Sequence, residues 1–409
     1  MHCADAAVTD LNLSALISEV KPGYCLPQAF YTDERIHAED IRRVYHKQWL
    51  YVGHELQIPK PGDYFTYKIG NESLIITRHK DGTVHALHNV CRHRGSAICT
   101  SEKGHANKLV CPYHQWVFDH DGALLAARQM PENFERKNFG LKRAHVGRIE
   151  GLIFINLSEN PPDFSQMQRD MSEFIKPHGL NNAKIAVVHK YDVQANWKLV
   201  VENSRECYHC HFGHPEYSAL MLSRPNDKQH VQQCIALHED RFAHYAKLGL
   251  RTKGAGGPST TGPNYSVSRY PFAVQDAVCE SEDRKLVAPV MGAFKDPDAG
   301  VCAGFHFPNF MFESSSDHFI TFRYDAVSAR RSSIEVMWFV RADAVEGRDY
   351  DVSKLTWFWK TTGEQDWKLA EDNQAGINSA FYEPGPYAPE EMGGPTWLLD
   401  WYVEQLKQQ

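Results

Sequence analysis

The sequence predicts an α+β protein, in which a small all-β domain precedes a larger domain that combines helices with strands. Between residues 49 and 157, short β-rich segments alternate with turn signals such as Gly70-Asn71 and Asp81-Gly82. The step Asn160-Pro161-Pro162 then indicates a boundary, and beyond it helical and strand-like patterns are mixed. We therefore expect three parts, which are a lead-in at 1–44, an all-β domain at 45–160 and an α+β domain at 163–409.

Each element follows from its own hydrophobic pattern. Residues 31–49 combine mixed charge with an apolar stripe at helical spacing, so the lead-in is expected to be helical and to pack on the larger domain. In the larger domain, helices are predicted at 169–180, around 202–211 and at 354–381, and strands at 184–201, 317–327 and 332–343.

Composition excludes several classes of protein. The chain has 409 residues, 42% of them hydrophobic, with a net charge of −7 and no dominant basic patch, so nucleic acid is not an expected partner. The N-terminus lacks the basic and apolar regions of a signal peptide, and no apolar run is long enough to span a membrane, so we expect a cytoplasmic protein without a membrane partner. In a reducing compartment the ten cysteines should be buried or act as ligands rather than form a disulfide framework.

Four residues in the β-rich part form the first constellation. Cys91-Arg-His93 is followed, after 17 intervening residues, by Cys111-Pro-Tyr-His114, so each half supplies one thiolate and one imidazole. A [2Fe–2S] cluster in which one iron takes two Cys and the other two His needs such a divided set. A structural zinc site is the alternative, but zinc sites usually pair Cys with Cys and His with His.

A second constellation lies in the larger domain, where Fe(II) could be held by two histidines and one carboxylate. His209 and His214 are five residues apart, which an unbroken helix would place on different faces. Gly213 and Pro215 can supply the necessary helix break. Spacing alone leaves the carboxylate open among Glu364, Asp366, Glu371 and Asp372 on the predicted late helix. Asp372 shares a helix face with small residues, which would let another element approach it closely.

Both constellations resemble those of one family. The segments C-R-H-R-G-S and C-P-Y-H-Q-W-V-F-D resemble the Rieske domain, and E-C-Y-H-C-H-F-G-H resembles the mononuclear iron motif of Rieske oxygenase large subunits. The resemblance implies an N-terminal Rieske domain, a helix-grip catalytic domain with an antiparallel sheet, cluster ligation by Cys91, His93, Cys111 and His114, and iron ligation by His209 and His214. It places the third iron ligand at Asp372, within E-D-N, and it assigns Glu206 to a bridge between the cluster of one subunit and the iron of its neighbour in a homotrimer.

Three further segments resemble one subgroup, the oxygenases that demethylate quaternary ammonium compounds. They are E-N-S-x-E-C-Y-H-C, A-V-E-G-x-D-Y-D near 344–351 and N-S-A-F-Y-E-P-G-P-Y near 378–387. This resemblance implies O₂-dependent N-demethylation of proline betaine or glycine betaine with release of formaldehyde, using electrons from a separate NAD(P)H-dependent flavin and [2Fe–2S] reductase. Arg269 and His306 are candidate partners of the substrate carboxylate. The alternatives are an aromatic-ring hydroxylating oxygenase and, from another class, a Rieske electron carrier.

Overall fold

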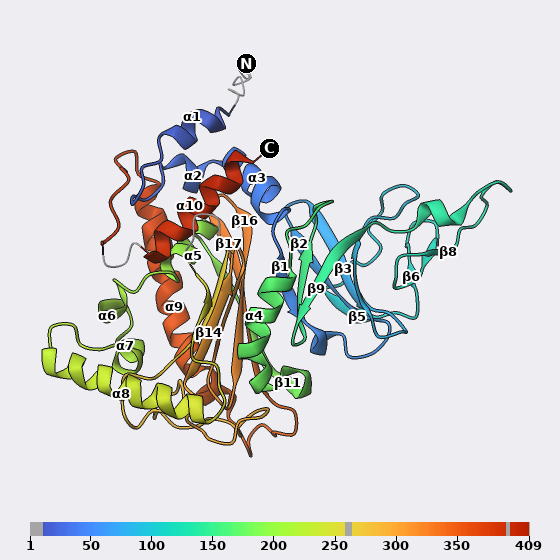
Figure 1. Ribbon diagram of the computed structural model, residues 1–409. Coiled ribbons are helices and arrows are strands. Elements are labelled where there is room, and N and C mark those ends of the chain that lie inside the picture. The colour runs from blue at the N-terminus through green and yellow to red at the C-terminus, as the bar shows by residue number, and fades with distance from the viewer. Residues whose placement is uncertain (1–10, 258–263, 390–392, 409) are drawn as a thin grey trace.

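Two parts of the chain lie side by side, a β-rich part and a part in which helices cover a second sheet (Figure 1). The computed structural model describes residues 11–257, 264–389 and 393–408. Both sheets are antiparallel and the helices belong mainly to the second part, so the predicted α+β class is confirmed. In the described ranges, no helix has both the length and the apolar character needed to cross a membrane.

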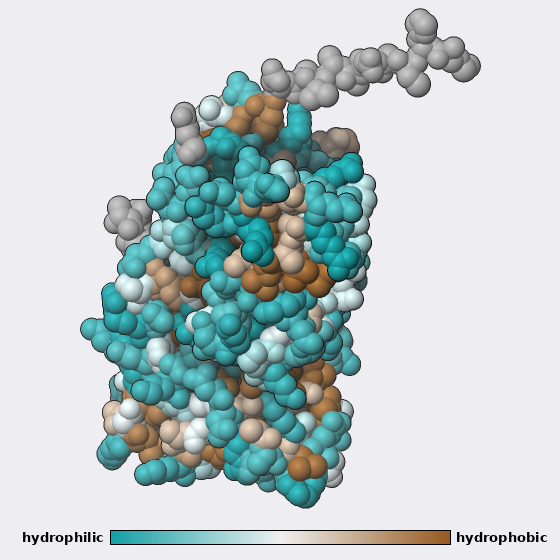
Figure 2. Space-filling view, turned by 90° about the vertical axis from the view of Figure 1, so that its right-hand side faces the viewer, coloured by the Kyte–Doolittle hydropathy of each residue, from teal (hydrophilic) through white to brown (hydrophobic). Residues whose placement is uncertain are grey.

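The β-rich part is built on a seven-stranded sheet of order β1-β10-β9-β4-β3-β2-β5. Its strands are β1 (Leu50–His54), β2 (Asp63–Ile69), β3 (Glu72–Arg78), β4 (Val84–His88), β5 (Lys103–His105), β9 (Arg143–Ile149) and β10 (Leu152–Asn156). A small sheet of β6 (Leu109–Val110), β7 (Val117–Phe118) and β8 (Leu124–Ala126) extends beyond it. The end of the molecule formed by this part has a largely hydrophilic surface with apolar side chains in small groups (Figure 2).

The second part is built on a seven-stranded sheet of order β11-β17-β16-β15-β14-β13-β12. Its strands are β11 (Ala183–Val193), β12 (Ala255–Gly256), β13 (Tyr265–Tyr270), β14 (Val301–His306), β15 (Phe310–Ser314), β16 (Phe319–Ser328) and β17 (Arg331–Arg341). The helices are α1 (Leu13–Ser18), α2 (Ala29–Thr32), α3 (Glu34–Glu39), η1 (Asp40–Tyr45), α4 (Ser165–Ile175), α5 (Trp197–Asn203), α6 (Cys210–Gly213), α7 (Pro215–Met221), α8 (Lys228–Lys247), α9 (Val352–Ile377) and α10 (Gly393–Lys407). The long helix α9 and the short α5 lie on one face of the sheet, and α4 lies on the side of the β-rich part (Figure 1).

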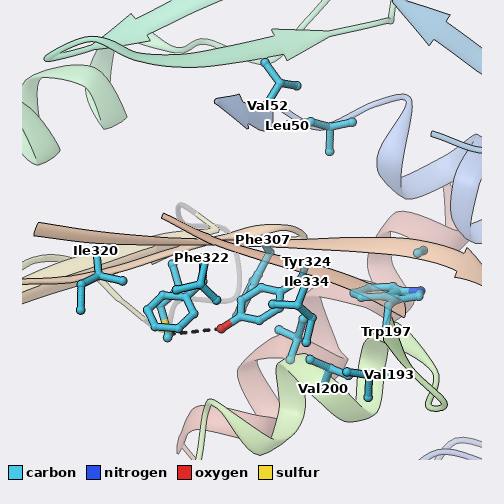
Figure 3. Packing of buried hydrophobic residues seen from close by; sticks show 14 of the residues in the cluster. Leu50, Val52, Val193, Trp197, Val200, Phe307, Ile320, Phe322, Tyr324 and Ile334 are labelled. Atoms are coloured by element: carbon cyan, nitrogen blue, oxygen red, sulfur yellow. Dashed lines mark hydrogen bonds between the residues drawn. The ribbon is translucent and has the colours of Figure 1, made fainter. Parts of the chain in front are cut away.

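Strand β16 connects the two parts because its side chains alternate between the faces of the sheet. Phe322 and Tyr324 point toward α5, whereas Leu50 and Val52 of β1 lie on the opposite side of the sheet (Figure 3). On that opposite side, Arg323 donates a hydrogen bond to the carbonyl of Val52 at 2.8 Å. One strand therefore fixes the β-rich part on one face and supplies aromatic residues to the helices on the other.

Helix α5 is anchored by a fully buried ion pair. Lys198 of α5 contacts Asp40 of η1, and both side chains are 0% exposed. Asp40 also accepts hydrogen bonds from Trp197 Nε1 at 2.9 Å and from the Tyr402 hydroxyl of α10 at 2.6 Å. A buried charge is tolerated only when it is paired and hydrogen-bonded, so this network fixes α5 between η1 and α10.

The prediction of one strand across 184–201 is wrong for its second half. β11 ends at Val193, and α5 begins after Asn196, whose side chain accepts a hydrogen bond from the Lys198 amide at 2.9 Å. Asn is a favoured N-cap, and it competes successfully with the strand propensity of the apolar run that follows it.

Candidate metal centres

Two equivalent loops at the far end of the β-rich part hold the four residues of the first constellation. In the first loop the Cys91 amide donates to the Ser96 carbonyl at 2.8 Å, and in the second the Cys111 amide donates to the Trp116 carbonyl at 2.9 Å. Both cysteines are buried, with exposed fractions of 3% and 1%. The loops thus place two thiols on the inner side, facing one another.

The two histidines of these loops lie nearer the surface. The rings of His93 and His114 meet edge to face with centroids 4.5 Å apart, and His93 stacks on Trp116. The Nδ1 atom of His93 is buried and has no hydrogen-bond partner in the structure, as expected of an atom that binds a metal. Two inner thiols and two outer imidazoles fit a [2Fe–2S] cluster with one pair on each iron.

The second centre is formed where a helix is interrupted. α6 ends at Gly213, His214 has φ −133° and ψ 76°, and α7 restarts at Pro215. This break turns His214 back toward His209, so that their Nε2 atoms lie 3.1 Å apart. The helix break expected from Gly213 and Pro215 is confirmed.

The carboxylate that completes this group is Asp366 on α9. Its Oδ1 lies 2.8 Å from His214 Nε2 and 3.3 Å from His209 Nε2. Two imidazole nitrogens and one carboxylate oxygen therefore converge on one point, which is the ligand set preferred by non-haem Fe(II) oxygenases. We refer to His209, His214 and Asp366 as the facial trio.

Partners on the outer side orient both histidines of the facial trio. His209 Nδ1 lies 2.6 Å from Glu206 Oε1, and His214 Nδ1 lies 2.8 Å from Gln365 Oε1. Hydrogen bonds of this kind fix the tautomer so that each Nε2 is free to bind a metal. Burial alone would lower the pKa of His209, but the carboxylates of Asp366 and Glu206 outweigh it and raise that pKa to about 9. The centre therefore favours a positive charge, and the donor set fits a divalent iron.

The sequence-based assignment of Asp372 as the third ligand is wrong. Its side chain is 60% exposed and forms an i,i+4 ion pair with Lys368 on the outer face of α9. The inward face of this helix carries Trp367, Ala370 and Gln374 instead, which are buried. The small residues near Asp372 face solvent rather than another element. Their presence on this face therefore does not indicate a metal ligand.

A signal for Asp366 was present in the helical pattern. Trp359, Gly363, Asp366 and Ala370 follow one another at spacings of three or four residues, so they share a face of α9. A carboxylate within this otherwise apolar and small stripe requires a buried partner. The resemblance of Glu371-Asp372-Asn373 to the family's ligand segment pointed to Asp372 instead.

One local disulfide occurs, although the sequence predicts no disulfide framework. Cys207 and Cys210 form a disulfide that encloses Tyr208 and His209, whereas the other cysteines of the described ranges, among them Cys91 and Cys111, are free. Sequence separation of three residues makes this a small local ring rather than part of a framework. The ring restrains the backbone that carries His209.

A cavity opens beside the facial trio. Its volume is about 90 Å³, well below the roughly 300–1,000 Å³ of clefts for larger ligands. Five aromatic side chains line it, namely Tyr217, Phe322, Tyr324, Trp359 and Trp367. Arg205 and Glu313 also line it and supply charges of opposite sign.

The suggested carboxylate partners Arg269 and His306 do not reach this cavity. Arg269 is 2% exposed, contacts the Ala299 carbonyl and faces the ring of Phe294. His306 is buried on β14 beside Phe154, and burial lowers its pKa to about 3. Both suggestions are therefore wrong, and Arg205 is the cation that the sequence did not single out.

Comparisons with known proteins assign both parts of the chain to known families. The family described as Rieske [2Fe-2S] domain matches residues 48–143, and that described as ring hydroxylating alpha subunit (catalytic domain) matches residues 180–408. This chain belongs to the Rieske oxygenase α subunits. As members of that family do, this enzyme uses a [2Fe–2S] cluster and a mononuclear iron, and it is a Rieske non-haem iron oxygenase.

Relatives and solved structures resemble this oxygenase along most of its length. The glycine betaine monooxygenase oxygenase subunit of Pseudomonas aeruginosa (strain UCBPP-PA14) is 39% identical over 94% of this chain and 89% of its own length. The crystal structure of the quaternary ammonium Rieske monooxygenase CntA with L-carnitine superposes with a TM-score of 0.69 at 22% identity, covering 97% of this chain and 99% of that one. The crystal structure of naphthalene 1,2-dioxygenase from Rhodococcus sp. superposes with a TM-score of 0.67 at 18% identity, covering 97% of this chain and 98% of that one. The fold alone therefore does not distinguish the substrate.

Proposed function

We propose that this oxygenase catalyses O₂-dependent N-demethylation of a small quaternary ammonium betaine, such as glycine betaine or proline betaine, with release of formaldehyde. The observation that carries the proposal is the small aromatic cavity beside the facial trio, which includes the carboxyl group of Glu313. A quaternary ammonium has no N–H to donate and is recognised through aromatic faces and carboxylates. The 39% identical relative named for glycine betaine supports the same substrate class.

The reaction divides into an oxidation and a spontaneous cleavage. O₂, two electrons and two protons convert one N–CH₃ group into N–CH₂OH and release water, and the carbinol then loses formaldehyde and a proton to leave the tertiary amine. Iron held by the facial trio would supply the oxidising chemistry. A cluster held by Cys91, His93, Cys111 and His114 would pass on the electrons that come from the separate reductase. The chain itself orients the substrate and excludes water from the cavity.

An aromatic-ring hydroxylase is the competing function, and the cavity argues against it. Arg205 and Glu313 would both be covered by an uncharged ring that satisfies neither charge. The volume of about 90 Å³ is also small for fused rings. A short zwitterion satisfies both charges and needs less space.

We further propose that the active form is a homotrimer in which Glu206 bridges neighbouring subunits. The loops with His93 and His114 and the helix α6 after His209 lie at opposite ends of one chain (Figure 1). Exposed aromatic side chains lie beside both places, with Tyr113 54% exposed near His114 and Tyr208 71% exposed near Glu206. Such residues are enriched at interfaces between proteins.

Formaldehyde release tests the proposed reaction. Pre-reduced protein with both metals would receive O₂ and one compound from a panel of glycine betaine, proline betaine, carnitine, choline and benzoate. Near-stoichiometric formaldehyde from one betaine is the expected result, and it names the substrate. No formaldehyde from any of them would discard the demethylase and leave the oxygenase. A diol from benzoate would establish the ring hydroxylase instead.

A further inference from the structure

Two charged side chains of opposite sign lie on the cavity without forming an ion pair. Arg205 follows α5 and Glu313 belongs to β15, and both line the cavity beside the facial trio and a second cavity next to it. In the described ranges, neither side chain forms an ion pair with the other or with a third group; their polar partners are a hydroxyl, a thioether and a phenol. Unpaired charges in an enclosed site are unfavourable unless a ligand compensates them.

The guanidinium of Arg205 has free donors. Nε donates to Ser204 Oγ at 3.3 Å, one terminal nitrogen lies 3.0 Å from Met311 Sδ, and the group lies 3.9 Å from the ring centroid of Phe305. These partners accept fewer bonds than a guanidinium can donate. Burial lowers the pKa of Arg205, which reflects the cost of the uncompensated charge. A planar carboxylate is the ligand that fits such a fork.

The opposite wall of the cavity suits a cation. The Glu313 carboxyl group accepts a hydrogen bond from Tyr270 at 3.0 Å. Burial raises the pKa of Glu313 well above its ordinary value, so a cation bound beside it is what stabilises its charged form. The indole of Trp359 donates Nε1–H to Glu280 at 3.0 Å, which pushes electron density into the ring that faces the cavity. An electron-rich indole face is the strongest aromatic partner of a quaternary ammonium.

We propose that Arg205 binds the carboxylate of the substrate while Glu313 and Trp359 bind its ammonium, so that the pocket selects short zwitterions. This inference rests on the proposed betaine substrate and goes beyond it, because it assigns each charge of the ligand to a residue. With both ends fixed, one N-methyl group faces the facial trio. A ligand that lacks either charge leaves one buried group uncompensated.

Binding to the iron-loaded protein under anaerobic conditions separates the two assignments without turnover. Three ligands of nearly the same shape are compared by titration calorimetry: glycine betaine, choline, which lacks the carboxylate, and 3,3-dimethylbutyrate, in which a neutral carbon replaces the nitrogen. We expect Arg205→Leu to weaken glycine betaine and 3,3-dimethylbutyrate about 10- to 100-fold and to leave choline unchanged. Glu313→Gln should weaken glycine betaine and choline and leave 3,3-dimethylbutyrate unchanged.

Control variants distinguish a loss of ligand recognition from a loss of folding. Arg205→Lys retains the charge without the fork and should restore part of the lost affinity. Arg348→Leu removes a charge from the exposed Arg348–Asp349 pair and should change none of the three affinities. The visible spectrum of the cluster and the iron content report whether each variant is intact.

The possible outcomes also separate this inference from the proposed reaction. Equal weakening of choline and 3,3-dimethylbutyrate by Arg205→Leu would overturn the assignment, even if formaldehyde is released from a betaine. The expected pattern of affinities without formaldehyde release would leave the assignment standing and remove the demethylation.

Discussion

Asp366 and Asp372 lie on the same helix, yet only Asp366 faces the two histidines. Its carboxylate lies 2.8 Å from His214 Nε2, while the Asp372 side chain is 60% exposed. We expect Asp366→Asn to lower the iron content from about three to about two atoms per chain, because the cluster keeps its two irons. Turnover should be lost while the visible spectrum of the cluster remains. Metal analysis and absorption spectroscopy provide the measurement.

Asp372→Asn is the matched control for this substitution. It makes the same chemical change on α9 but removes only an exposed ion pair with Lys368, which contributes little. Iron content and turnover should match the unaltered protein. Loss of iron from Asp372→Asn, or full retention in Asp366→Asn, would contradict the facial trio as the structure has it.

Among the elements, periodicity predicted α9 well but not which of its faces meets the metal. The helix was expected at 354–381 and occurs at Val352–Ile377. Its buried face could be predicted from Trp367, Ala370 and Gln374, which are apolar or hydrogen-bonded to neighbours. The position of Asp366 opposite His209 depends on α6 and α7, whose placement is decided by tertiary packing. Helical spacing therefore reduces the number of candidate carboxylate ligands on α9, but it does not identify which of them binds the metal.

Helix α10 positions the segment that carries Arg205. A Cβ atom on Gly394 would lie 1.8 Å from the Arg205 carbonyl oxygen, so the backbone there would have to move. We expect Gly394→Ala to displace this segment, to weaken betaine binding and to reduce iron occupancy, while the distant cluster keeps its spectrum. Iron analysis and betaine titration measure the effect.

Gly376 of α9 is the control glycine for that prediction. Nothing lies within 4 Å of a Cβ placed there. Gly376→Ala should leave the metals unchanged and stabilise the helix by roughly 0.5–1 kcal/mol, because alanine restricts the unfolded chain. Equal iron contents in both variants would show that α10 does not position Arg205.

For the whole molecule, buried neutral histidines predict how stability depends on pH. Burial lowers the pKa of His306 to about 3, while the unfolded chain has an ordinary value near 6.5. Between pH 6.5 and pH 3 the unfolded state binds a proton that the folded state excludes. The free energy of unfolding therefore falls as the pH decreases from 6.5 toward 3. The loss is about 1.4 kcal/mol per pH unit for this histidine.

Denaturant unfolding at pH 7.5 and at pH 5 tests this contribution. His306→Phe keeps a ring without a basic nitrogen, so the fall in unfolding free energy between the two pH values should be smaller by about 2 kcal/mol. The same substitution at the exposed His145 should leave the difference unchanged. An unaltered pH dependence in His306→Phe would show that this side chain is protonated in the folded protein.

Subunit mixing tests whether the sites of neighbouring chains work together. One parent carries Cys111→Ser and lacks the cluster, and the other carries Asp366→Asn and lacks the iron, so each alone should be inactive. Co-purified mixed oligomers should recover activity, because an iron-bearing subunit can meet the cluster of its neighbour. Adding Glu206→Gln to the iron-bearing subunit should reduce the recovered activity about 10- to 100-fold, since that residue holds His209.

Placing Glu206→Gln in the subunit that lacks iron is the matched control. There the residue borders an empty centre, so the recovered activity should stay at the level of the unmodified mixture. Inactive mixtures of confirmed composition would instead mean that each chain uses only its own cluster. In that case the two ends of the molecule, which are separated in one chain, would have to approach one another by a domain movement, and the exposed aromatic residues beside them would need another partner.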